Sequence, residues 1–144
     1  MAPTVADLMN RDIEFCIPDC SVQSVARTMA ERNVGSIPVV DNTDHMVPIG
    51  IITDRDIVTR VIAPALDPCL VRVDQCMSLE VRTVLGNAPV PDAVSLMQRH
   101  DLRRLPVVDD TGRLVGIISL AEMTRPGDAR QNAETIRELS EPVS

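Results

Sequence analysis

The chain contains the same pattern of residues twice, and this repeat limits its possible folds more than any other feature. The segment IPVVD, which begins at Ile37, recurs as LPVVD from Leu105, at an offset of 68 residues. Two extra residues in the first copy bring the next shared residues, Gly50 and Gly116, to an offset of 66. Repeated units of this kind cannot bury their apolar faces alone. We therefore expect two similar units that share a core.

Each repeat is expected to form a strand, a helix, two further strands and a last helix. Apolar residues fall at helical spacing over residues 22–29 and again over 90–97, which predicts one helix in each repeat. The apolar segments 37–40 and 47–52 flank a polar turn and predict a hairpin. The sequence thus predicts an α/β fold of the α+β type, in which the two repeats pack about a pseudo-twofold axis that carries a cleft.

The extent of the similarity sets the predicted boundaries. The first repeat spans residues 1–66 and the second spans residues 67–125. Residues 126–144 have no counterpart in the repeat and are mostly polar. This tail either forms a helix that Asp128 caps or is a frayed chain end.

The balance of charges argues against two classes of partner. The chain has 14 Lys and Arg against 21 Asp and Glu, a net charge of -7, and so lacks the basic surface that nucleic acids and anionic membranes attract. No apolar stretch approaches the roughly 18 residues of a membrane span, and the first residues lack a signal-peptide pattern. We expect a cytoplasmic protein with four reduced cysteines and no metal site, because the spacing of metal ligands is absent.

These repeated residues resemble a known family. IPVVD and GIITDRD in the first copy, and LPVVD and GIISLAE in the second, are similar to segments of the CBS domain, named after cystathionine β-synthase. The pair resembles a Bateman module over residues 5–125, and is similar to small stand-alone bacterial proteins made of a CBS pair. The resemblance implies a regulatory module that binds an adenosine compound such as AMP, ATP or S-adenosylmethionine. It also implies a homodimer that assembles four CBS units into a disc.

The resemblance further implies which residues bind the ligand. The motif of the family is Gly, two apolar residues, Ser or Thr, two variable residues and Asp. In the first copy this motif falls on Gly50, Thr53 and Asp56. The second copy has Glu in place of the Asp, and its motif positions are Gly116, Ser119 and Glu122.

The residue types of the first motif suit a nucleotide. A glycine at position 50 lets the backbone come close to a ligand. Thr53 is expected at the N-terminus of a helix, where free N–H groups favour a phosphate. Asp56, one turn later, can accept hydrogen bonds from both hydroxyls of a ribose. The first copy is therefore predicted to bind the ligand.

Four residues outside the motifs complete the predicted site. The apolar strand that begins with Ile37 and Pro38 can cover the flat base. Arg55 is a candidate for contact with an anion. The resemblance implies a phosphate contact for one of the adjacent Arg103 and Arg104, which point to opposite faces of an extended segment, and Arg104 is the candidate chosen here. The alternative for each arginine is an ordinary solvated charge or a local ion pair.

A second interpretation of the motifs needs no ligand. Thr-x-x-Asp and Ser-x-x-Glu are both capping-box patterns, in which each side chain bonds the backbone N–H of the other residue. Glu122 suits such a box better than a ribose, because its longer side chain reaches back to the start of the helix. The second copy is thus predicted to be more structural than the first.

The sequence leaves two main classes of function open. The first is a non-catalytic sensor of an adenosine nucleotide that acts through a homodimer on an unidentified regulated protein. The alternative is a dimeric scaffold that binds proteins with its pockets empty. An enzyme is a minor third interpretation, since no nucleophile or paired carboxylates can be named for it. The apolar segments 57–62 and 120–123 are predicted to form the dimer interface.

Overall fold

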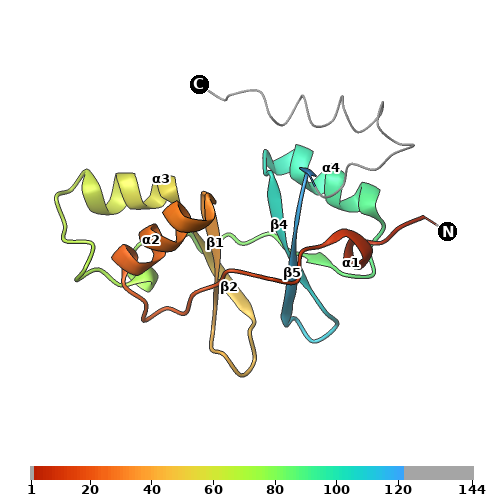
Figure 1. Ribbon diagram of the computed structural model, residues 1–144, viewed down its shortest axis with the longest axis horizontal. Helices are drawn as coiled ribbons and strands as arrows, with labels where there is room; N and C mark the ends of the chain where they lie inside the picture. The colour runs from red at the N-terminus through yellow and green to blue at the C-terminus, as the bar shows by residue number, and fades with distance from the viewer. Residues whose placement is uncertain (1, 122–144) are drawn as a thin grey trace. The chain divides into compact units, whose positions relative to one another are not determined.

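The structure is a computed structural model that describes residues 2–121, and these residues form two compact units. The unit that we call the first consists of residues 14–81. The second unit consists of residues 82–121 together with the N-terminal residues 2–13. Figure 1 labels the main helices and strands of both units. The predicted tail, 126–144, lies outside the described residues.

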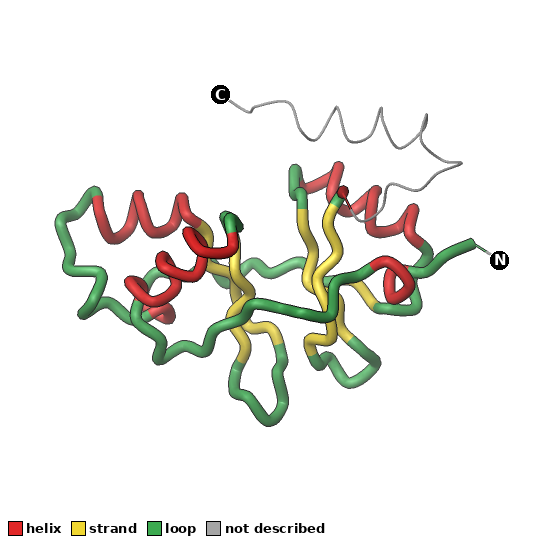
Figure 2. Tube along the Cα trace, viewed as in Figure 1, coloured by secondary structure: helices red, strands yellow, loops and turns green. Residues whose placement is uncertain are grey.

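The first unit is a hairpin with helices packed against it (Figure 2). Its strands β1 and β2 are antiparallel, with Ile37 opposite Ile52. Cys16 forms a single parallel β-bridge with Val39. This bridge takes the place of the strand that is predicted before the first helix of the repeat. The elements are α2 (Val22–Arg32), β1 (Ser36–Val40), β2 (Pro48–Thr53), α3 (Asp54–Ile57), the π-helical η1 (Val58–Ile62) and the 3-10 helix η2 (Val73–Gln75).

The second unit repeats this plan. Strands β4 and β5 are antiparallel, with Leu105 opposite Ile118, and β3 pairs in parallel with β4. The hairpins of both units change register at the same place, between Val39 and Val40 and between Val107 and Val108. The elements are α1 (Val5–Leu8), β3 (Val84–Leu85), α4 (Val90–His100), β4 (Arg104–Val108) and β5 (Leu114–Ser119).

The helices α2 and α4 form where the apolar periodicity predicts them. Ser21 caps α2, because its hydroxyl accepts a hydrogen bond from the Ser24 N–H at 3.2 Å. Both helices end at a left-handed residue, Asn33 with φ of 55° and Asp101 with φ of 54°, which are residue types that tolerate this conformation. Each helix buries the predicted apolar stripe against its own unit.

Each unit has its own aliphatic core. The chain contains a single aromatic residue, Phe15, so branched and linear aliphatic side chains fill the interior. The centre of the first core is formed by Val22, Ile37, Val39, Ile52 and Val61. The centre of the second is formed by Val5, Met97, Leu105, Val107 and Ile118.

The two repeats exchange their opening segments. Asn10, near the start of the first repeat, pairs with Ile117 of the second unit through N–H···O bonds of 2.8 and 3.0 Å. Ser78, at the same place in the second repeat, pairs with Ile51 of the first unit through bonds of 2.8 and 2.9 Å. The compact units therefore do not follow the sequence repeats 1–66 and 67–125, because each unit includes the opening segment of the other repeat.

The prediction of a mixed α and β fold with two repeats is confirmed. The hairpin of the first unit begins its second strand at Pro48, one residue later than predicted. The pseudo-twofold axis and its cleft stay predictions. Among residues 2–121, the helices are all too short or too polar to cross a membrane.

Candidate functional site

The motif of the first repeat lies where β2 passes into α3. Thr53 has extended backbone angles, φ −115° and ψ 163°, and its hydroxyl oxygen accepts the Asp56 N–H at 3.0 Å. In return, Asp56 Oδ2 accepts the Thr53 N–H at 3.0 Å. The capping box that the sequence offered as an alternative is thus present. It fixes the Asp56 carboxylate at the start of the helix.

Asp56 is the one charged residue that is buried among those the structure describes, with 8% of its surface exposed. The Ser78 hydroxyl lies across the two carboxylate oxygens and donates to them, at 3.2 Å from Oδ1 and 3.4 Å from Oδ2. The guanidinium of Arg60 is 4.0 Å from Oδ1. A buried charge needs such partners, and here the chain itself supplies them.

Arg60 connects this carboxylate to the segment that carries Ser78. Its Nη1 donates to the carbonyl oxygens of Cys76 at 3.0 Å and Met77 at 3.2 Å. Burial raises the pKa of the Cys76 thiol, and the negative charge of Asp56 raises it further. Ser78 and Arg60 were not predicted as site residues. They lie 22 and 4 residues from Asp56, and the partner of Ser78 becomes evident only in the folded unit.

The packing of the first unit itself requires a glycine at position 50. A Cβ on Gly50 would lie 2.8 Å from the Ser78 carbonyl oxygen and 3.0 Å from Met77 Sδ. The backbone that comes close to this glycine is therefore residues 77–78 of the chain itself. The Cβ position of Gly50 is thus filled by protein, and the approach of a ligand to this glycine stays a prediction.

Three other predicted residues of the first unit differ in how exposed they are. Ile37 is 2% exposed and packs in the aliphatic core, so its side chain does not line a surface of this unit. Pro38 is also buried, and its carbonyl oxygen accepts the Cys16 N–H at 3.1 Å. Arg55, in the first turn of α3, is exposed and can reach a ligand in solvent.

The motif of the second repeat belongs to the second unit. Gly116 is crowded as Gly50 is, since a Cβ there would lie 2.5 Å from Met9 Sδ and 3.1 Å from the Asn10 carbonyl oxygen. Ser119 ends β5 opposite the exposed Arg104 at the start of β4. Glu122 lies outside the described residues. The predicted capping box of this copy stays a prediction.

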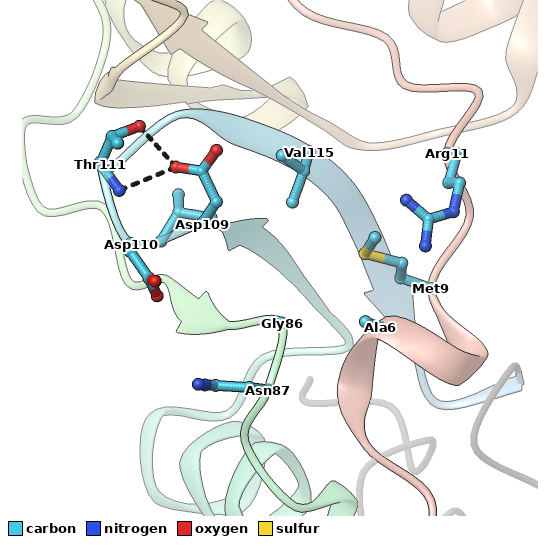
Figure 3. Close-up of a pocket in the computed structure, with 10 residues that line it drawn as sticks. Ala6, Met9, Arg11, Gly86, Asn87, Asp109, Asp110, Thr111 and Val115 are labelled. Atoms are coloured by element: carbon cyan, nitrogen blue, oxygen red, sulfur yellow. Dashed lines mark hydrogen bonds between the residues drawn. The ribbon is translucent and has the colours of Figure 1, made fainter.

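A pocket of about 510 Å³ lies in the second unit, beside the turn between β4 and β5 (Figure 3). Met9 and Val115 form part of its apolar lining, with the exposed Arg11 and Asp110 toward its edges. Asp109 Oδ1 already accepts the Thr111 N–H at 2.9 Å and the Thr111 hydroxyl at 2.6 Å. This pocket includes none of the predicted site residues, and its polar groups do not converge on one point.

Comparison with known proteins identifies the family. The model of the CBS domain matches residues 5–63 and 73–125, and the chain belongs to the CBS domain family. The CBS domain-containing protein YhcV of Bacillus subtilis is 38% identical over 120 residues, which are 83% of this chain and 82% of YhcV. An uncharacterized protein of Methanopyrus kandleri is 37% identical over 83% of this chain, which spans 60% of the length of that relative.

Solved structures agree with this assignment. The CBS domain pair of protein MJ0100, crystallised with 5′-methylthioadenosine and S-adenosyl-L-methionine, has a TM-score of 0.72 and 26% identity to this chain. The alignment covers 87% of this chain and 95% of that one. The resemblance to small stand-alone CBS proteins is confirmed, and CBS pairs are regulatory modules.

Proposed function

We propose that the chain is a non-catalytic regulatory sensor that binds an adenosine compound at Asp56. The observation that carries the proposal is a buried carboxylate, 8% exposed, held in a fixed orientation by the Thr53 N–H. A fixed pair of carboxylate oxygens suits two neighbouring hydroxyls, as on a ribose. Support comes from the related CBS pair that was crystallised with two adenosine compounds. AMP, ATP and S-adenosylmethionine are the ligands to test.

Two further residues extend the proposed site toward an anion. Arg55 follows the motif threonine by two residues and is exposed, so its guanidinium is free to meet a phosphate or carboxylate. Arg104 is the corresponding candidate in the second unit, at the exposed start of β4. We propose that the first motif dominates binding because Asp56 has the shorter side chain than Glu122, which leaves room for a sugar.

Calorimetric titration of AMP, ATP and S-adenosylmethionine into the whole chain tests the proposal. Wild-type protein should give saturable binding with at least one of them. Asp56→Ala should weaken binding about 100-fold or more, because two hydrogen bonds to a charged group are lost. Asp54→Ala is the matched control, since it removes an exposed carboxylate two residues away and should bind as wild type. Glu122→Ala should keep most of the binding.

The competing function predicts a different result in the same titration. If the chain is a ligand-free scaffold, none of the three compounds binds wild-type protein at millimolar concentration. A protein partner would then be the primary ligand. Binding that survives Asp56→Ala would instead place the nucleotide elsewhere in the chain, and leave Thr53 and Asp56 with a capping role alone.

We also propose that the chain acts as a homodimer in the cytoplasm. The helical segment after the motif carries Val58 and Ile62, which are 57% and 54% exposed and lie four residues apart. Leu66 follows at 48% exposure. Apolar residues at this spacing lie on one face of a helix, and a second copy of the chain would cover them. A regulated protein would then contact the dimer.

A further inference from the structure

We propose that Ser78 is a latch on the Asp56 site: a diol that binds the carboxylate displaces the Ser78 hydroxyl and loosens residues 78–81. This inference deepens the proposed function and depends on it. It assigns a role to residues that lie outside the family motif, and it gives the sensor a first step of signalling.

The latch and the ligand compete for the same atoms. The Ser78 hydroxyl is nearly equidistant from Oδ1 and Oδ2, at 3.2 and 3.4 Å, so it occupies the edge of the carboxylate between the two oxygens. A ribose diol would use that same edge, with one hydroxyl on each oxygen. The position behind Oδ2 is already taken by the Thr53 N–H at 3.0 Å. With 8% of Asp56 exposed, the diol has to replace Ser78 rather than join it.

The chain is held firmly before Ser78 and weakly after it. Cys76 is 2% exposed in the core, and the N–H groups of Cys76 and Met77 donate to the Val73 carbonyl oxygen at 3.1 and 2.9 Å. Arg60 donates to the carbonyl oxygens of Cys76 and Met77, and the Ser78 backbone pairs with Ile51. Beyond this point the attachment weakens, because Leu79 is 75% exposed and Glu80 is exposed as well. Loss of the hydroxyl contact would therefore loosen the segment from its end, starting at residues 79–81.

This segment is also where the chain leaves the first unit. The chain passes between the units at residues 13–14 and again at 81–82. Residues 78–81 form the final part of the first unit before the second crossing. A change in their mobility is thus passed covalently to residue 82 and to β3, which begins at Val84. The signal needs no second ligand.

The corresponding residue of the other repeat is built differently. Asn10 stands 68 positions before Ser78 and makes the same kind of backbone pairing. Its side-chain Oδ1 accepts the Asp12 N–H at 2.9 Å, so this oxygen stabilises the turn that follows Asn10. We confine the latch to the first motif, whose hydroxyl and carboxylate both lie among the described residues.

Replacement of Ser78 separates the latch from the site itself. In Ser78→Ala no hydrogen bond has to be broken, so AMP should bind about 2- to 10-fold more tightly than to wild type, the equivalent of one such bond. Ser78→Thr keeps the hydroxyl and should bind with wild-type affinity. Equal or weaker binding by Ser78→Ala, with AMP binding still dependent on Asp56, overturns the latch and leaves the proposed function intact. If wild-type protein binds none of AMP, ATP and S-adenosylmethionine, both the latch and the proposed function are overturned.

Hydrogen exchange supplies a second readout, which does not depend on a measured affinity. AMP should speed the exchange of amides 78–81 in wild-type protein, although ligands usually slow exchange where they bind. In Ser78→Ala these amides should exchange fast without AMP and change little when it is added. Slower exchange of 78–81 in wild type with AMP bound would overturn the latch, because the segment would then be tightened by the ligand.

Discussion

The carbonyl oxygen of Ser78 lies directly over Gly50, so close that a Cβ on the glycine would come within 2.8 Å of it. The two residues belong to different sequence repeats, and the N–H of Ser78 bonds the carbonyl of Ile51 beside this contact. The same relationship holds between Asn10 and Gly116 in the second unit. The motif glycines therefore secure the exchange of opening segments between the repeats.

Gly50→Ala should lower the free energy of unfolding by about 1–3 kcal/mol, the usual cost of overpacking. The added methyl group meets backbone at Ser78, which cannot move without breaking its pairing with Ile51. Gly116→Ala should cost less, because its nearest neighbour is the flexible side chain of Met9. Urea unfolding of both variants measures the difference.

Gly86→Ala is the control for these two substitutions. A Cβ at Gly86 would make ordinary contacts of 3.5 Å with Ala6 and 3.7 Å with Val107, so stability should change little. A Gly50→Ala protein as stable as wild type, but deficient in nucleotide binding, would contradict the packing explanation. It would restore the interpretation in which the glycine makes room for a ligand.

The sequence predicts local features well, because they depend on nearby residues. The helix stripe of Val22, Val25 and Met29 is buried as its spacing requires. The Thr53–Asp56 capping box needs residues only three apart, and it is present. The two hairpins also follow from apolar segments around a polar turn.

The contacts between distant segments could not be predicted in this way. Ile37 is predicted to cover a base because it starts an apolar strand, but residues 37–40 are apolar without alternation, so the sequence does not tell which side chains face the core. All four are buried. The partner of Asp56, Ser78, is 22 residues away in the next repeat. A pattern of repeats gives no information on which unit an opening segment joins.

Val58→Glu combined with Ile62→Glu should convert the proposed dimer into a monomer. The two side chains are more than half exposed in the single chain, so charges there should disturb an interface and not the core. Light scattering should give about twice 15.7 kDa for wild type and about 15.7 kDa for the variant. Wild-type protein that is monomeric at micromolar concentration would refute the dimer.

Cys69 should react with iodoacetamide far faster than Cys16 in the folded protein. Cys69 is exposed, whereas burial raises the pKa of Cys16 from 9.0 to about 12, with smaller effects of Cys20 and Cys76. That shift alone cuts the thiolate fraction at pH 8 by about a thousandfold, and the thiolate is the reactive form. Mass spectrometry of timed digests measures both rates, and in urea they should become similar. Comparable rates in the native protein would contradict the burial of Cys16.

Asp41 and Asp109 should make the stability of the chain depend on acid pH. They occupy equivalent positions after β1 and β4, and both carboxylates accept hydrogen bonds within their turns. The Val47 N–H, at 2.9 Å, is the main cause that lowers the pKa of Asp41. The Thr111 hydroxyl, at 2.6 Å, is the main cause for Asp109.

The sign of the effect follows from these lowered pKa values. Both carboxylates stay ionised to a lower pH in the folded protein than in the unfolded chain. Their contribution to the free energy of unfolding is therefore complete above the unfolded pKa of 3.8, and it is lost as the pH falls through the folded pKa values. Asp41→Asn with Asp109→Asn should be less stable than wild type at pH 7, and its stability should fall less steeply between pH 5 and 2. Asp110→Asn removes a neighbouring charge without these hydrogen bonds and serves as the control. Thermal unfolding across this pH range measures all three proteins, and a double variant with the same pH profile as wild type would show that the turns do not govern the acid response.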